Sequence, residues 1–326
     1  MRNTTRILGV AGAVAAVACA AATPALATGL KYRFAFTTAR PAAPTGLSTR
    51  IAYPDGPSGK PKAVRSLRIE LPAGSRFDPS VVPTCTASDA ELALSIDSCP
   101  PDSRLGGGTG TVVTGFGAPI DPIAGDVHLY HGPGEIIAAG TPPESRSALT
   151  VSRLEIDGNT LTDPSIPPAP GGPPDGETVA EQVDIAVAPH VTGEGDKQRA
   201  FLSSPPICPA SLTWTSRISA TFSDGSTDSA ISHAPCIRPS MRLSISPRRA
   251  RATRRTTFRF KVSSSSARCE RGALIRFGGA NVRTDLDGRA RVSRSFVRTG
   301  LRRARVVHKG CRADRAGVRV LPAARH

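Results

Sequence analysis

Arginine gives the sequence its strongest chemical signal. Arginine runs occur only near the C-terminus, and their members are Arg248, Arg249, Arg251, Arg254, Arg255, Arg302, Arg303 and Arg305. A guanidinium group binds phosphate or carboxylate through two parallel hydrogen bonds. In the stretch Arg289–Val292, basic and apolar residues alternate, which places the basic ones on one face of a strand. The pattern therefore predicts one coherent patch that binds a polyanion. The alternative interpretation is a soluble surface whose arginines reflect a GC-rich genome.

The distribution of charge favours the first interpretation. The 326 residues carry 42 basic and 26 acidic side chains. Residues 240–326 hold 24 of the basic side chains and only four acids, a net charge of +20, whereas the rest of the chain is slightly acidic. Codon usage alone would make both parts basic. We therefore expect an anionic cell-wall polymer or membrane surface as partner. The basic part has four Phe and no Trp or Tyr for base stacking, so no specific nucleic acid is expected.

Three other motifs have simpler interpretations than catalysis. His128 and His131 stand three apart, so on a strand they face opposite sides and cannot share a metal ion. The segment 224–228 spaces oxygen ligands as a calcium loop does, but Asp224-Gly225 favours a hairpin turn. The glycine-rich segment 104–110 lacks the Lys-Ser/Thr of a phosphate-binding loop and predicts a bulge or bend. We predict no metal site, no cofactor and no catalytic residue.

A second class of function stays open. The sequence has no Gly-x-Ser-x-Gly motif, and single-sequence reasoning cannot separate a catalytic carboxylate pair from solvated acids. We expect a non-enzymatic protein. The alternative is an exported hydrolase or carbohydrate-binding protein with its site in residues 28–238. Such a site needs clustered carboxylates or exposed aromatic side chains, and the available Trp and Tyr residues are Trp214, Tyr32, Tyr53 and Tyr130.

The N-terminus predicts export. Arg2 and Arg6 precede an apolar run over 7–22, and Ala25-Leu26-Ala27 forms a small-x-small cleavage site. Residues 1–27 are therefore predicted to be a signal peptide, with a mature start at Thr28 and a secreted or envelope-associated product. Two alternatives remain: a retained anchor, and a lipoprotein modified at Cys19.

The cysteine count agrees with export. Without Cys19, six remain: Cys85, Cys99, Cys208, Cys236, Cys269 and Cys311. An even number in an exported chain predicts disulfides. Six cysteines allow 15 connectivities, and proximity favours 85–99, 208–236 and 269–311.

Residues 28–238 predict a β-sandwich. Short runs with a period of two, separated by Pro and Gly, include 30–36, 47–53, 64–71, 110–113, 125–130, 148–156, 183–187, 212–222 and 227–233. One helix is expected over 88–97, because Ser88 and Glu91 match a capping box and Cys85 and Cys99 flank the segment. The Pro/Gly stretch 164–174 predicts an exposed loop.

Residues 239–326 predict a second sandwich. A Gly272–Phe277 strand, a Thr284–Ala290 turn region and a closing run over 316–320 follow one another. This order resembles the bacterial immunoglobulin-like domains of the invasin and intimin type, over about a quarter of the chain. The resemblance implies an Ig-like fold in which Cys269 and Cys311 tie two strands, and it implies little about function. The whole chain also resembles exported proteins of high-GC actinobacteria. The prediction is thus an all-β protein of two sandwich domains, acidic over 28–238 and basic over 239–326.

Overall fold

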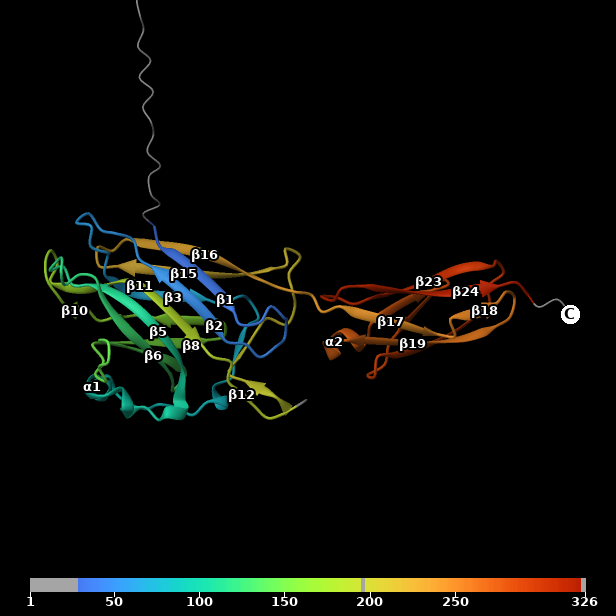
Figure 1. Cartoon of the computed structure of the whole chain (residues 1–326), viewed down its shortest axis with the longest axis horizontal. Helices are drawn as coiled ribbons and strands as arrows, with labels where there is room; N and C mark the ends of the chain where they lie inside the picture. Colours follow the sequence, from blue (N-terminus) through green and yellow to red (C-terminus); the bar gives the residue numbers. More distant parts are fainter. Residues whose placement is uncertain (1–28, 195–196, 324–326) are drawn as a thin grey trace, which may run out of the picture.

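Strands are the dominant secondary structure of the protein, and they are arranged in two lobes that lie end to end (Figure 1). The computed structural model describes residues 29–194 and 197–323. The predicted signal peptide, its cleavage point before Thr28, and Cys19 lie outside the described residues. The predicted all-β class with two β-sandwiches is confirmed. No helix in the described ranges is long and apolar enough to cross a membrane.

The N-terminal lobe contains the first sixteen strands. They are β1 Lys31–Phe36, β2 Leu47–Ala52, β3 Val64–Glu70, β4 Arg76–Phe77, β5 Arg104–Val113, β6 Ile123–Gly132, β7 Glu135–Thr141, β8 Thr150–Asp157, β9 Thr160–Asp163, β10 Ala169–Pro170, β11 Glu177–Val187, β12 Val191–Thr192, β13 Arg199–Ala200, β14 Leu202–Ser203, β15 Thr213–Phe222 and β16 Thr227–Pro235. The helical segments are α1 Asp89–Leu94 and the short 3-10 turns Pro79–Val81, Ile96–Ser98 and Pro101–Ser103.

One continuous sheet forms both layers of this lobe. Its strand order is β1-β2-β11-β5-β6-β7-β8-β9-β3-β15-β16, with β10 paired to β11. The sheet curves until its end strands lie beside each other. There the backbone N–H groups of Leu30 and Phe34 donate to the side chains of Asp228 and Ser232, at 2.6 and 2.9 Å. Buried apolar side chains from both layers fill the interior, as the alternating pattern predicts.

Glycines allow two strands of this sheet to approach closely. In β5, a Cβ at Gly106 would lie 2.0 Å from the Ala186 carbonyl oxygen, and one at Gly108 would lie 1.9 Å from that of Asp184. Both carbonyls belong to β11, the hydrogen-bonded neighbour. The strand also carries a register irregularity between Arg104 and Gly106. The bulge expected for the glycine-rich segment is thus present, inside the strand rather than before it.

Helix α1 follows the predicted start signal. The Ser88 hydroxyl accepts from the Glu91 N–H, and the Glu91 carboxylate accepts from the Ser88 N–H at 2.7 Å, which completes the capping box. The helix ends at Leu94 and a 3-10 turn follows, so the α-helical part is shorter than expected. Leu92 and the Cys85–Cys99 disulfide pack with Ile137 of β7 in a small separate core.

The C-terminal module is an immunoglobulin-like sandwich. Its elements are β17 Met241–Ser246, β18 Arg249–Arg251, β19 Thr256–Ser264, α2 Ala267–Glu270, β20 Leu274–Phe277, β21 Ala280–Arg283, β22 Arg289–Arg294, β23 Gly300–Val307 and β24 Asp314–Leu321. A three-stranded sheet, β17-β19-β22, faces a five-stranded sheet, β18-β24-β23-β20-β21. The chain changes sheets between β17 and β18, and a core rich in Phe and Val lies between the layers.

All three predicted disulfides are present: Cys85–Cys99, Cys208–Cys236 and Cys269–Cys311. One expected consequence is wrong. Cys269 and Cys311 do not tie two strands, because Cys269 lies in α2 and Cys311 in the turn between β23 and β24. The bond therefore fixes the two connections at the end of the module that meets the N-terminal lobe (Figure 1).

The expected domain boundary near Pro239 falls between β16 and β17. No sheet crosses it in the described residues, and the Arg268 guanidinium bridges the lobes by donating to the Pro206 carbonyl at 2.9 Å. The independence of the two lobes stays a prediction.

Candidate polyanion-binding surface

The predicted arginines occupy three kinds of position in the C-terminal module. Arg249 and Arg251 point outward from β18, and Arg248, Arg254 and Arg255 are exposed in the connections on either side of it. Arg303 and Arg305 are exposed on β23, because the residues that alternate with them, Ala304 and Val306, face the core.

Arg302 differs from the other predicted residues. It lies on the inner side of β23 and is half-buried, with its guanidinium 5.5 Å from the centre of the Phe296 ring. Its Nη2 donates to the Arg298 carbonyl at 3.0 Å. Arg302 therefore closes the end of the core by a cation–π contact, and its assignment to the outer surface is corrected.

Four of the arginines line one hollow. An open depression of about 440 Å³ is bordered by Arg249, Arg251, Arg254 and Arg255, with Thr256, Thr257 and Leu321. No Asp or Glu borders it. Four arginines around an open space without carboxylates form a site to which an anion is attracted.

The acids of the module do not neutralise its arginines. Glu270 accepts from the Ser264 N–H, Asp285 from the Arg289 N–H, and Asp314 from the Leu243 N–H, at 2.6, 2.8 and 2.7 Å. These carboxylates cap backbone groups. All nine ion pairs found among the described residues involve residues from Arg50 to Asp224, in the N-terminal lobe. The module therefore presents its positive charge without internal compensation.

Strand pairing places like charges directly opposite one another. On the outer face of the five-stranded sheet, Arg305 of β23 is paired with Arg276 of β20 on one side and Arg315 of β24 on the other. On the three-stranded sheet, Arg259 opposes Arg291. Such pairs destabilise a sheet, so the fold tolerates a cost at the positions where charge is concentrated.

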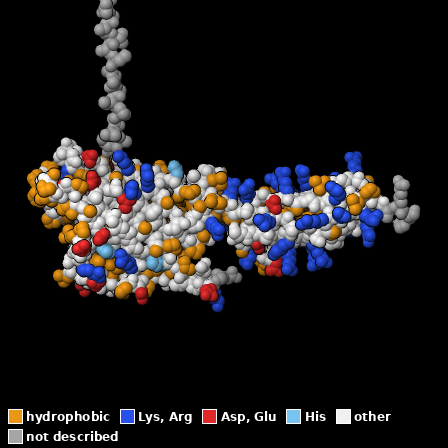
Figure 2. Space-filling view, viewed as in Figure 1, with side chains coloured by type: hydrophobic (Ala, Val, Ile, Leu, Met, Phe, Trp, Pro, Cys, Tyr) orange, Lys and Arg blue, Asp and Glu red, His pale blue; other side chains and the backbone are white. Residues whose placement is uncertain are grey.

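The expected single patch on one sheet face is not what the structure shows. Arginines of both sheets point outward, so positive charge surrounds the module, as the alternation of each strand requires. The charge is instead uneven along the module. All four acids lie near the N-terminal lobe, and on the face shown in Figure 2 no acidic side chain is visible toward the far end.

Sequence reasoning missed part of this surface. Arg276, Arg283, Arg315 and Arg319 belong to the outer face of the five-stranded sheet. They stand singly in the sequence rather than in runs. The spacing of four between Arg315 and Arg319, on a strand with apolar Val318 and Val320, was the available signal, because such spacing shares a face.

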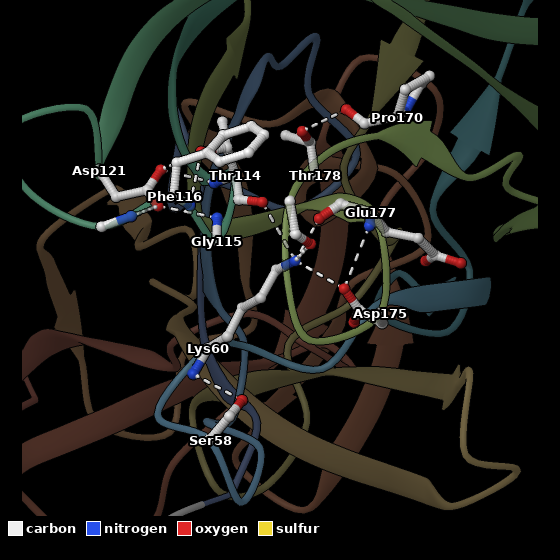
Figure 3. A network of polar contacts seen from close by, with 12 residues as sticks. Ser58, Lys60, Thr114, Gly115, Phe116, Asp121, Pro170, Asp175, Glu177 and Thr178 are labelled. Carbon is white, nitrogen blue, oxygen red and sulfur yellow. Dashed lines mark hydrogen bonds and ion pairs between the residues drawn. The ribbon is translucent and has the colours of Figure 1, made fainter.

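A different polar cluster organises the N-terminal lobe (Figure 3). The side chain of Lys60 is 5% exposed and its ammonium group donates to Asp175 at 2.7 Å, to the carbonyls of Thr114 and Gly172 at 3.3 and 3.4 Å, and to the Glu177 carbonyl. This hydrogen bond and charge lower the pKa of Asp175. Lys60 thus holds the predicted Pro/Gly loop, which contains β10, against the ends of β5 and β11.

Asp121 closes the neighbouring loop. Its carboxylate accepts from the Thr114 N–H and hydroxyl at 2.6 and 2.7 Å and from the N–H groups of Gly115 and Gly117 at 2.8 and 2.9 Å. Desolvation raises the pKa of Asp121, but these hydrogen bonds outweigh it and lower the pKa to about 2. Both clusters are internally satisfied and shape the loops at one edge of the sheet.

The histidine pair and the Asp-Gly motif of the N-terminal lobe occupy a strand and a hairpin turn. His128 is half-buried near Arg104, whereas His131 is buried with its Nδ1 2.9 Å from the Val82 carbonyl oxygen, so the two rings occupy different environments on β6. Asp224-Gly225 forms the turn between β15 and β16, as predicted. No cluster of three metal-ligating side chains occurs in the part of the chain that the structure describes.

The aromatic residues considered for a carbohydrate site are mostly internal. Trp214, Tyr32 and Tyr130 are buried, and Tyr53 is half-buried. Trp214 packs on the Cys208–Cys236 disulfide, and its indole N–H donates to the Ile207 carbonyl at 3.2 Å.

The fold and this surface together define a disulfide-bonded protein whose Ig-like module is strongly basic. No protein-family model matches the chain, and no curated protein matches it. It is similar to the major pilin subunit of Bacillus cereus at 8% identity and a TM-score of 0.27, over 90% of this chain and 66% of that one. It is also similar to the T6 backbone pilin of Streptococcus pyogenes, at 6% identity and a TM-score of 0.28, over 89% of this chain and 52% of that one. A third similar structure is murine CEACAM1b, at 8% identity and a TM-score of 0.25, over 90% of this chain and 100% of that one. The chain thus spans less than two thirds of either pilin, and these likenesses assign neither family nor function.

Proposed function

We propose that this is a non-enzymatic exported protein that is held at an anionic surface by its C-terminal Ig-like module. The observation that carries the proposal is the absence of any ion pair in residues 241–321, although 22 Arg and Lys side chains are exposed there. Three disulfides support export, because such bonds persist in oxidising compartments. The N-terminal lobe is the part that the module would hold in place.

The expected binding mechanism is multivalent. Guanidinium groups spread over two sheets contact several anionic groups of one surface, and each contact releases condensed counterions. No single arginine dominates the free energy of binding. Binding therefore weakens steeply as salt is raised from about 0.1 M to about 1 M, where the Debye length falls from ~10 Å to ~3 Å.

Retention of the full disulfide-bonded chain on immobilised long-chain polyphosphate, measured over a salt series, tests the proposal. Arg249→Gln, Arg254→Gln and Arg255→Gln together should elute at lower salt than the unmodified protein. The matched control replaces three exposed arginines of the N-terminal lobe, Arg33, Arg40 and Arg76, by Gln, and should elute unchanged. Equal elution of the two triple variants, or retention that salt does not alter, would overturn it.

A further inference from the structure

The end of the C-terminal module farthest from the N-terminal lobe combines charge with exposed apolar side chains. We call it the distal end; it comprises the connections 247–255, 278–279 and 295–299 and the strand ends beside them (Figure 1). Its exposed arginines are Arg248, Arg249, Arg251, Arg254, Arg255, Arg294, Arg298 and Arg319. It contains no Asp or Glu among the described residues.

Two large apolar side chains project from this end. Val297 is 86% exposed and Leu301 is 58% exposed. Val297 lies next to Arg298 in the connection from β22 to β23, and Leu301 lies on the outward face at the start of β23, positions where hydrated side chains would be expected. Binding to a hydrated polymer would not remove these apolar side chains from water. Insertion at the boundary between the headgroups and the acyl chains of a bilayer would remove them from water, which is favourable.

The loop that carries Val297 is anchored to the core. Phe296, next to Val297, packs on Phe258 and Phe277 with ring centres 6.0 and 5.6 Å apart. The Phe296 carbonyl accepts from the Thr253 N–H at 2.8 Å, which joins this loop to the connection bearing Arg254 and Arg255. Val297 therefore lies on a loop that is joined directly to the connection that borders the arginine hollow.

We propose that the distal end docks on a bilayer that contains anionic phospholipid. This inference rests on the proposed function and names the anionic surface that the module binds. Val297 and Leu301 enter the interface between headgroups and acyl chains, and the surrounding arginines bind lipid phosphates. The proximal end cannot dock in this way, because its exposed Leu286, at 77%, stands between Asp285 and Asp287.

The test compares two probes with the full disulfide-bonded chain. One probe is vesicles of equal parts phosphatidylglycerol and phosphatidylcholine, and the other is long-chain polyphosphate, which has phosphate but no apolar phase. Val297→Ser with Leu301→Ser should lower vesicle binding about tenfold, because two partly buried apolar side chains are lost. The same variant should leave polyphosphate binding unchanged. Leu286→Ser is the control, because Leu286 is 77% exposed but lies at the proximal end, and it should change neither.

A second pair of variants tests the position of the charge. Arg249→Gln, Arg254→Gln and Arg255→Gln together should weaken binding to vesicles more than Arg271→Gln, Lys309→Gln and Arg312→Gln, which remove three exposed charges from the proximal end. Polyphosphate binding without vesicle binding, or equal effects of Leu286→Ser and the Val297/Leu301 variant on vesicles, overturns this inference and leaves the proposed function intact. Failure to bind either probe overturns both.

Discussion

Asp121 shows how one side chain can organise a loop. Its carboxylate accepts four hydrogen bonds, and its pKa lies near 2 instead of 3.8. A carboxyl whose pKa is lowered on folding contributes stability above its unfolded pKa and loses that contribution as the pH falls through the folded value. Asp121→Asn should therefore lower the free energy of unfolding at about pH 6 and have little effect near pH 2.

Urea unfolding of both proteins between those pH values measures this difference. Asp102→Asn is the control, because Asp102 is exposed and its carboxylate accepts no hydrogen bond among the described residues. A destabilisation by Asp121→Asn that stays constant down to pH 2 would contradict the assignment.

Lys60 is a second residue whose charged group contacts only other groups of the N-terminal lobe. Replacing it with Met removes one donor each from Asp175 and from three carbonyl groups, and breaking such a buried pair is costly. We expect Lys60→Met to lower the free energy of unfolding by about 2–3 kcal/mol, less than a fully buried pair because Asp175 is partly exposed. Lys62→Met, which removes a more exposed pair with Asp224, should cost clearly less, because solvent screens that pair. Equal costs in urea unfolding would show that burial is not the deciding factor.

At the scale of elements, the register of strand pairing places arginines of neighbouring strands directly opposite one another. Arg305 stands between Arg276 and Arg315, so Arg305→Glu replaces two repulsive neighbours by attractive ones. We expect the free energy of unfolding to rise by about 0.5–1 kcal/mol at low salt. The same substitution at Arg217, which opposes Glu70 on β3, should have the opposite sign.

Urea unfolding at low and high salt distinguishes this from a propensity effect. The gain from Arg305→Glu should shrink as salt screens the charges. If Arg305→Glu and Arg217→Glu change stability in the same direction, the charge argument is wrong.

Alternation predicted most strands because most have one face in the core and one in water. Strand β7 was not predicted, because both its faces are buried. Ile136 packs in the main core, and Ile137 packs in the small core beneath α1. Its sequence therefore has no period of two. β9 has only four residues, and the glycines of β5 carry no hydropathy signal.

For the candidate polyanion-binding surface, the sequence predicted which side chains face outward but not how the strands are arranged around them. Alternation over 289–292 correctly placed Arg289 and Arg291 on the outward face of β22. It could not assign strands to sheets, because β17 and β18 are neighbours in sequence but belong to different layers. It also could not show that Val297 and Leu301 share an end with the arginine hollow, since that depends on the direction in which each strand runs.

For the whole molecule, the unequal charge of the two lobes predicts unequal responses to salt. The N-terminal lobe holds all nine ion pairs of the described residues, whereas the C-terminal module has no ion pair there and pairs arginines opposite one another. Screening weakens both attraction and repulsion. Salt should therefore leave the N-terminal lobe unchanged or slightly less stable and should stabilise the module.

Calorimetry of the full chain in about 20 mM and about 0.5 M NaCl tests this, because separate cores predict two transitions. Phe258→Ala and Phe201→Ala, each at a fully buried position in one core, identify the transitions by lowering one Tm each. The transition lowered by Phe258→Ala should move to higher temperature with salt, and the other should not. A single transition would show that the lobes unfold together and would place no thermodynamic boundary near Pro239. Two transitions that move together would mean that the exposed arginines repel too weakly to matter, and the surface would then lack the uncompensated charge on which binding to an anionic partner depends.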